Sequence, residues 1–242
     1  MNEPYVVLIT NVTSYVGPAA VDRLIADGAT IVAQSRDFDE VAVQQAFHRK
    51  YPTVKIVGHD ERKLVEAALN AYGRLDCVVS NDDARAVRAD ITGANMDEFR
   101  AGLEQMLIRP FSLAQAAIPP MKGQGGGRIL LITSAAPLRG LPNYCMYAAA
   151  RGGANALVLS IARELAPHNI LVNAIAPNYV ENPTYFPPEL LSDPAARAKI
   201  IRNIPLGRLG APEEVGALVS FYAMGDCGFV TGHVVPVAGG WA

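Results

Sequence analysis

Short apolar runs alternate with longer stretches of helical periodicity along the whole of this 242-residue chain. The apolar runs predict strands at residues 5–10, 30–34, 54–57, 75–80, 128–133, 170–175 and 234–237. Helices are predicted between them, at residues 17–27, 41–51, 61–72, 96–121, 147–165 and 212–222. This alternation predicts an α/β fold, in which a doubly wound parallel sheet carries helices on both faces.

A single domain is expected across residues 1–242. The glycine-rich stretch at 123–127 is too short for a domain linker and is typical of a turn into the next strand. Half of the residues are hydrophobic and 18% are charged, which is typical of a compact globular chain. The formal net charge of -2 gives no electrostatic basis for binding nucleic acid or a membrane surface.

Cysteine usage favours a reducing compartment. Cys77, Cys145 and Cys227 are far apart and form no C-x-x-C motif, and the four histidines show no metal-ligand spacing. Neither a disulfide scaffold nor a metal site is therefore expected. The first predicted strand begins at residue 5, and no apolar run is long enough for a bilayer, so a cytoplasmic protein without a signal peptide is expected.

Polar residues follow several predicted strands. Ser134 comes directly after the strand at 128–133, and Asn81 follows the strand at 75–80. Tyr179 follows the strand at 170–175 by a short loop. In a parallel sheet the carboxyl ends of the strands meet at one edge, where ligands bind, so we expect these residues to converge.

Tyr147 and Arg151 lie four positions apart on one predicted helix and therefore share a face. A fixed positive charge beside a phenol favours the phenolate, which suits Tyr147 to act as a general base. Such a pair can equally be an ordinary surface contact. Ser134 precedes Tyr147 by thirteen residues, and its hydroxyl is suited to hold a substrate oxygen, which favours the catalytic interpretation.

The first strand–helix turn, T-N-V-T-S-Y-V-G at residues 10–17, lacks the glycines of a dinucleotide-binding turn. Gly17 remains, at a position that suits close packing of helix on strand. Tyr15 would crowd a pyrophosphate, although a degenerate turn that still binds nucleotide through a shifted backbone is the alternative. Arg36, at the end of the second strand, could favour NADP through a 2′-phosphate or could simply be solvated.

Four segments carry a resemblance to a known superfamily: V-V-S-N-D at 78–82, I-T-S at 132–134, Y-A-A-A-R at 147–151 and T-G-H-V-V-P-V-A-G-G at 231–240. The chain resembles the short-chain dehydrogenases/reductases over essentially its full length, which implies a Rossmann-like fold. Dehydrogenases of that superfamily use Ser-Tyr-Lys, a glycine-rich turn and a helix asparagine. Here Arg151, Tyr15 and Met106 stand at those places, departures that resemble the halohydrin dehalogenases.

This resemblance implies the conversion of a vicinal haloalcohol to an epoxide, a halide and a proton. It also implies the reverse opening of epoxides by small anions such as azide, cyanide or nitrite, no cofactor, and a homotetramer. Ser134 would hold the substrate oxygen, Tyr147 would take its proton, and Arg151 would keep Tyr147 deprotonated. The competing hypotheses are an NADP-dependent short-chain dehydrogenase/reductase with an atypical turn and a non-catalytic member of the fold.

The family's Pro-Asn-aromatic halide site is matched by Pro177, Asn178 and Tyr179. Backbone N–H groups of Tyr179 and Val180 are the expected anion donors. The other expected lining residues of the halide and substrate site are Tyr15, Tyr185, Phe186, Leu138 and Leu141. For the aromatic pair at 185–186, packing of a proline-rich loop remains an alternative.

Asp82 stands where the dehydrogenases usually have a small residue. Its carboxylate could orient Arg151, directly or through water, or it could cap the end of the preceding strand. Both roles remain open from the sequence.

Overall fold

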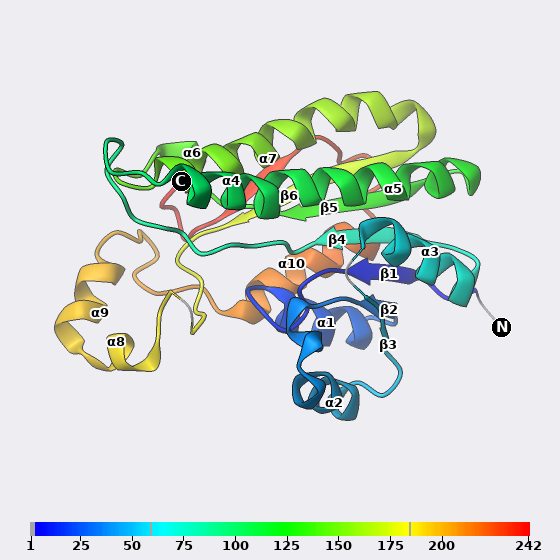
Figure 1. Ribbon diagram of the computed structural model, residues 1–242, viewed down its shortest axis with the longest axis horizontal. Coiled ribbons are helices and arrows are strands. Elements are labelled where there is room, and N and C mark those ends of the chain that lie inside the picture. Colours follow the sequence, from blue (N-terminus) through cyan, green and yellow to red (C-terminus); the bar gives the residue numbers. More distant parts are fainter. Residues whose placement is uncertain (1–2, 59, 184) are drawn as a thin grey trace.

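Parallel strands form one sheet in the computed structural model, which describes residues 3–58, 60–183 and 185–242 (Figure 1). The strand order is β3-β2-β1-β4-β5-β6-β7. Their bounds are β1 Val6–Ile9, β2 Thr30–Ala33, β3 Lys55–Ile56, β4 Cys77–Ser80, β5 Gly127–Ile132, β6 Ile170–Pro177 and β7 Val234–Val237. The order reverses direction between β1 and β4, which creates the crevice where doubly wound folds bind ligands. The predicted fold class is confirmed.

Helices cover both faces of the sheet (Figure 1). On one face lie α1 (Gly17–Ala26), α2 (Val41–Lys50) and α10 (Pro212–Met224). On the other lie α3 (Glu61–Tyr72), α4 (Met96–Leu103), α5 (Arg109–Gly123) and α7 (Cys145–Leu165). Shorter helices are α6 (Ala136–Arg139), α8 (Pro188–Ser192) and α9 (Pro194–Ile201), with 3₁₀ turns η1 (Arg36–Asp39) and η3 (Ala166–His168) and a π-turn η2 (Glu104–Ile108).

Strand β1 contributes to the core on both of its faces. Val7 and Ile9 pack with α1 and α10 side chains, whereas Val6 and Leu8 pack with side chains of α3, α5 and α7. All four side chains are completely buried. The continuous apolar run therefore reflects burial on both sides, as expected for a central parallel strand.

The predicted helix at 96–121 is interrupted by η2, which separates α4 from α5. Pro110 has no N–H to donate to the carbonyl four residues earlier, and a π-turn occupies the segment just before it. Met106 lies in this turn and is buried. The helices α8 and α9 were not predicted, because each is short and begins at a proline that is also typical of a loop.

Gly17 begins α1 against the backbone of the turn that precedes it. A Cβ at this position would lie 2.5 Å from the carbonyl oxygen of Asn11, so only glycine permits this packing. Gly17 therefore sets how closely α1 approaches the end of β1. Within the described part of the chain, no helix combines the length and hydrophobicity needed to cross a bilayer.

Candidate active site

A cavity of about 330 Å³ lies at the carboxyl end of the sheet. Its lining includes these predicted site residues: Tyr15, Ser134, Leu141, Tyr147, Pro177, Asn178, Tyr179, Val180, Tyr185 and Phe186. Ala86, Ala136, Tyr144 and Asn182 also line the cavity, although the sequence did not predict them there. Leu138 is placed outside the lining, on α6, where 49% of the residue is exposed.

Arg151 lies beneath the cavity between two phenol rings. Its guanidinium carbon is 5.7 Å from the centre of the Tyr147 ring and 5.8 Å from that of Tyr15, and the residue is only 2% exposed. Burial acts to lower the pKa of Arg151, but the neighbouring Tyr147 and Tyr15 phenols outweigh it and the pKa is raised. The side chain therefore remains a cation directly beside Tyr147.

Main-chain carbonyl groups hold this cation in place. Nη1 of Arg151 donates to the carbonyl oxygens of Asp82 and Ile132, both at 2.9 Å. These two acceptors lie beyond the end of β4 and at the end of β5, respectively. The strands of the sheet thus fix the guanidinium relative to Tyr147, which the helix α7 carries one turn earlier.

The carboxylate of Asp82 has other partners. It accepts hydrogen bonds from Ser80 Oγ at 2.7 Å, Thr10 Oγ1 at 3.0 Å and Asn11 Nδ2 at 3.0 Å. Burial raises the pKa of Asp82, while the bond from Ser80 and the charge of Arg109 act to lower it. The carboxylate therefore links the ends of β1 and β4, which corresponds to the strand-end role considered from the sequence. The contact with Arg151 is made by the Asp82 main-chain carbonyl and not by the carboxylate.

Ser134 follows β5, and its side chain and main chain have different partners. Its Oγ accepts a hydrogen bond from the Ala136 N–H at 3.1 Å, which leaves the hydroxyl proton available to a substrate oxygen. Its carbonyl oxygen accepts from Nδ2 of Asn155 at 3.3 Å. Asn155 lies on α7 one turn beyond Arg151. It could have been predicted from the sequence, because Tyr147, Arg151 and Asn155 follow one another at intervals of four residues and share a helix face.

The first turn places an aromatic wall against the cavity. Tyr15 adopts a positive φ of 54°, and its hydroxyl donates to the Thr133 carbonyl oxygen at 3.2 Å. Burial first, and then the neighbouring Tyr147, raise the pKa of Tyr15 well above its ordinary value. Tyr15 is therefore a neutral hydrogen-bonded wall, and Tyr147 is the phenol that faces the cavity beside Ser134.

The loop after β6 forms the opposite wall. Tyr179 has a positive φ of 55°, and its N–H donates to Oδ1 of Asn178 at 3.0 Å. The N–H of Val180 has no hydrogen-bond partner among the described residues. Of the two expected anion donors, one is therefore already bonded within the loop and the other is available.

Tyr185 and Phe186 continue this wall. Burial first, and then the neighbouring Tyr147, raise the pKa of Tyr185 to about 12. The Phe186 ring centre lies 6.2 Å from that of Tyr179, and the Trp241 ring lies 5.7 Å from Tyr179 on an edge-to-face contact. Tyr185 and Phe186 both line the cavity, and Phe186 also packs within the loop. Lining the site and packing the loop, which the sequence analysis gave as alternatives, therefore occur together.

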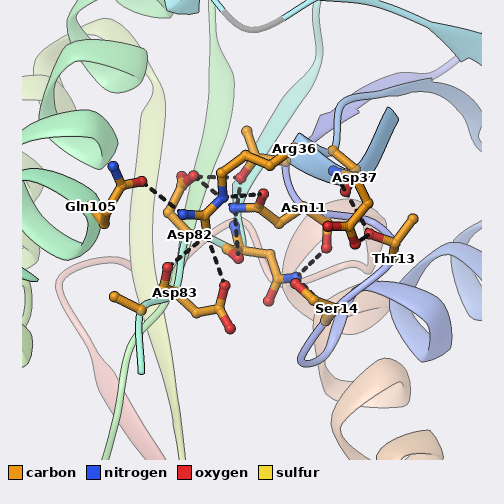
Figure 2. A network of polar contacts seen from close by, with 12 residues as sticks. Asn11, Thr13, Ser14, Arg36, Asp37, Asp82, Asp83 and Gln105 are labelled. Atoms are coloured by element: carbon orange, nitrogen blue, oxygen red, sulfur yellow. Dashed lines mark hydrogen bonds and ion pairs between the residues drawn. The ribbon is translucent and has the colours of Figure 1, made fainter. Parts of the chain in front are cut away.

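Arg36 spans the crevice between the two halves of the sheet (Figure 2). Its Nη2 donates to the carbonyl oxygen of Asp83 at 2.7 Å and to the Asp83 carboxylate at 3.1 Å. Its Nη1 donates to Oε1 of Gln105 at 3.0 Å, and its Nε donates to Oδ1 of Asn11 at 3.3 Å. Arg36 keeps 39% of its side chain exposed, but all three of its guanidinium nitrogens already donate to protein acceptors, so none is free to receive a 2′-phosphate.

The residues of this crevice do not fit a dinucleotide. A bound nucleotide would pass over the first turn, between the end of β2 and the end of β4, where the Arg36 side chain crosses from one to the other (Figure 2). Tyr15 stands on the turn that would have to approach the pyrophosphate. In the described residues, no group of three or more His, Cys, Asp or Glu side chains is arranged to hold a metal ion.

Comparison with known proteins identifies the family. The family model described as enoyl-(acyl carrier protein) reductase matches residues 12–242. The chain belongs to the short-chain dehydrogenase/reductase family. Among curated members of this family, it is 33% identical to the 3-oxoacyl-[acyl-carrier-protein] reductase FabG of Thermotoga maritima, over 98% of each chain.

Two solved structures resemble this short-chain dehydrogenase/reductase member closely. A structure described as a dehalogenation enzyme is 42% identical, with a TM-score of 0.94 and 99% of each chain covered. A halohydrin dehalogenase, HheC, bound to ethyl (2S)-oxiran-2-ylacetate is 36% identical, with a TM-score of 0.92, covering 97% of this chain and 96% of that one. The resemblance to halohydrin dehalogenases within the family is therefore confirmed.

Proposed function

We propose that this chain is a halohydrin dehalogenase, a lyase that converts vicinal haloalcohols to epoxides without a nucleotide. The observation that carries the proposal is the position of the buried Arg151 cation against Tyr147, at a cavity that also presents Ser134. The Arg36 contacts across the nucleotide crevice support independence from a dinucleotide. The resemblance to the HheC structure with its bound epoxide supports the substrate class.

In the proposed reaction Ser134 donates its hydroxyl proton in a hydrogen bond to the substrate oxygen, and Tyr147 as phenolate removes the substrate's hydroxyl proton. The resulting oxyanion attacks the neighbouring carbon, the carbon–halogen bond breaks, and the halide leaves with the bonding pair. The proton remains on Tyr147 and then passes to solvent. The protein supplies no covalent nucleophile, because both reacting groups belong to one substrate molecule.

The leaving halide would lie against Pro177 and Tyr15, with the Val180 N–H as a donor. In the reverse direction the same position would hold azide, cyanide or nitrite next to an epoxide. A small anion needs far less room than a nicotinamide ring, which agrees with a wall formed by the Tyr15 and Tyr185 phenols.

A nicotinamide-dependent reductase is the second candidate, because the curated relatives include reductases at about one third identity. The features that weigh against it are Tyr15 on the first turn and Arg36 across the crevice. These features leave the haloalcohol reaction as the better-supported proposal.

Halide release tests the proposal directly. Purified protein is incubated with a vicinal bromo-alcohol and no nucleotide, and bromide is measured over time beside Tyr147→Phe and Ser134→Ala. We expect release from the wild type and a loss of at least about 100-fold in Tyr147→Phe. Unchanged release in Tyr147→Phe would overturn the proposed role of Tyr147, and saturable protection from unfolding by NADPH would support the reductase instead.

We also propose a homotetramer, with helices α4–α5 and α7 at the subunit contacts. Phe111 on α5 and Leu159 on α7 are large apolar side chains with 45% and 49% exposure, which supports a covered face there. Light scattering of the purified protein measures the mass, and a monomer would contradict this proposal.

A further inference from the structure

The loop between β4 and α4 forms part of the cavity wall without a helix or strand of its own. It runs from residue 81 to residue 95, and Ala86 within it lines the cavity. The Ala89 N–H donates to the Asn143 carbonyl oxygen at 2.9 Å, which ties the far part of the loop to the turn before α7. An irregular segment keeps a defined position only where such contacts offset the entropy of ordering it. The position of the wall at Ala86 therefore depends on the contacts on both sides of it.

Arg36 binds the near end of this loop from across the crevice. Its Nη2 donates to the Asp83 carbonyl oxygen at 2.7 Å and forms an ion pair with Oδ1 of the same residue at 3.1 Å. Its Nη1 and Nε donate to Gln105 and Asn11, so the π-turn η2 and the first turn hold the guanidinium in place (Figure 2). A planar fork with several donors suits these acceptors, whereas the single ammonium of a lysine does not. Arg36 thus fixes the main chain three residues before Ala86.

The next residue of the loop meets the opposite wall of the cavity. The Tyr185 hydroxyl donates to the Ala84 carbonyl oxygen at 3.5 Å, and Tyr185 and Ala86 both line the cavity. Asp83 and Ala84 are consecutive, so the carbonyl group that Arg36 binds directly precedes the one that contacts Tyr185. A continuous series of contacts therefore joins Arg36 to the cavity wall, although Arg36 itself lies outside the lining.

The proposed reaction assigns the other walls to the reacting atoms. Ser134 and Tyr147 take the substrate oxygen, and the halide lies on the side of Val180. The wall formed by Ala86 and Tyr185 remains for the substituent on the carbon that carries the hydroxyl group. A cavity of about 330 Å³ leaves room there for a substituent as large as a phenyl ring.

We propose that Arg36 is a positioning residue for this substituent: by holding the main chain at Asp83, it keeps the wall at Ala86 where the substituent can pack against it. The inference rests on the proposed function, because that function assigns this wall to the substituent. It gives a residue of the former nucleotide crevice a part in substrate preference. Removing Arg36 should therefore change which haloalcohol is preferred and not the chemistry at Tyr147.

A comparison of two substrates tests this inference. The kcat/KM of bromide release is measured with 2-bromo-1-phenylethanol and with 2-bromoethanol, which lacks the substituent. Loss of folded protein lowers both values equally, so their ratio reports on the wall. We expect Arg36→Gln to lower the ratio roughly 5-fold, mainly through a higher KM for the phenyl substrate, because the loop must then be ordered on binding. Arg36→Lys keeps a cation near Asp83 without the fork and should restore only part of the ratio.

Two further variants of the loop separate position from charge. Arg85→Gln is the matched control, because it removes the same charge from an exposed residue of the same loop and should keep the wild-type ratio. Asp83→Ala removes the carboxylate and keeps the carbonyl group that Arg36 binds, so it should lower the ratio less than Arg36→Gln. Equal ratios in the wild type and Arg36→Gln would overturn the inference, as would an equal fall in Arg85→Gln.

Binding of 1-phenyl-1,2-ethanediol gives a readout without turnover. This diol carries the phenyl substituent and no halogen, and calorimetry measures its Kd. We expect roughly 5-fold weaker binding to Arg36→Gln and unchanged binding to Arg85→Gln. If the diol behaves in this way while the wild type releases no bromide, the positioning role stands and the proposed function fails. If the diol binds the wild type and Arg36→Gln equally well, or binds neither, the positioning role is overturned.

Discussion

Arg151 binds the main-chain carbonyl of Asp82 and leaves the Asp82 carboxylate to other donors. This separation has an electrostatic consequence. A carboxylate paired directly with the guanidinium would offset its charge, whereas a carbonyl group orients the guanidinium and leaves its net charge intact. The guanidinium therefore keeps its full positive charge, with its central carbon 5.7 Å from the centre of the Tyr147 ring.

Asp82→Asn should consequently cost stability more than it affects the position of Arg151. The carboxylate accepts three hydrogen bonds, and an amide places an N–H₂ among those donors. We expect a loss of about 1–3 kcal/mol in the free energy of unfolding, measured by urea titration. Bromide release should remain within about 10-fold of the wild type, because the carbonyl that holds Arg151 is unchanged.

The stability cost of Asp82→Asn should also depend on pH. Burial raises the folded-state pKa of Asp82 above its unfolded value of about 3.9, so the folded state binds this proton more tightly. The contribution of Asp82 to wild-type stability is then greatest below that unfolded value and is lost as the pH rises through the folded pKa. The difference in unfolding free energy between wild type and variant should shrink from pH 4 to pH 8. A difference that grows with pH would contradict this assignment.

Arg151→Lys should impair turnover although it keeps a positive charge. The wild-type side chain reaches two carbonyl oxygens at 2.9 Å and still lies beside the Tyr147 ring. A lysine lacks the planar fork, so its charge is held less firmly near the phenol. We expect kcat for bromide release to fall roughly 10- to 100-fold, with the pH profile displaced upward. A variant with wild-type kcat at every pH would show that the fork is dispensable.

The fold was predictable because its signals are local. Burial on both faces makes β1 a continuous apolar run, and the four-residue spacing of Tyr147 and Arg151 directly gives a shared helix face. The interruption at η2 was not predicted, because the apolar periodicity continues through it while Pro110 changes the hydrogen bonding. Periodicity reports which face is buried, and it does not report where the helical pitch changes.

The polar contacts of the site were harder to predict because each depends on side-chain rotamers between distant segments. Arg36 and Asp83 are far apart in the sequence, and only the strand order brings them together. The hydrogen bond from the Tyr179 N–H to Asn178 Oδ1 depends on the positive φ of Tyr179, which the residue types do not indicate. The sequence thus predicted which residues gather at the cavity, but it did not predict which donors are already bonded.

Asn155→Leu should reduce turnover by disturbing Ser134. The variant keeps the approximate volume and loses the donor to the Ser134 carbonyl oxygen, at 3.3 Å in the wild type. One neutral hydrogen bond of about 1 kcal/mol corresponds to a fall in kcat of roughly 5-fold, with bromide affinity unchanged. Ser160→Ala, on the exposed face of the same helix, is the matched control and should keep wild-type kcat. Equal effects of the two substitutions would point to a general change in α7.

Asn178→Ala should strengthen anion binding. In the wild type Asn178 Oδ1 occupies the N–H of Tyr179, so an incoming halide must compete with it for that donor. Removing this acceptor frees the donor, and a gain of about 1 kcal/mol corresponds to a roughly 5-fold lower Kd for bromide. Trp241 is the single tryptophan of the chain and contacts the Tyr179 ring, so its fluorescence reports the binding.

Two further variants distinguish competition between Asn178 and the anion from structural support of the loop by Asn178. Asn178→Asp retains the acceptor and adds a negative charge, so bromide should bind at least about 10-fold more weakly than to the wild type. Asn182→Ala removes an amide that binds Val180 and Tyr185 in the same loop and leaves the Tyr179 N–H bonded to Asn178. If Asn178→Ala and Asn182→Ala both weaken bromide binding, Asn178 supports the shape of the loop. If Asn178→Ala alone strengthens bromide binding, the Asn178 carboxamide competes with the anion for the Tyr179 N–H. A loosened loop would hold its N–H donors less well and would weaken bromide binding.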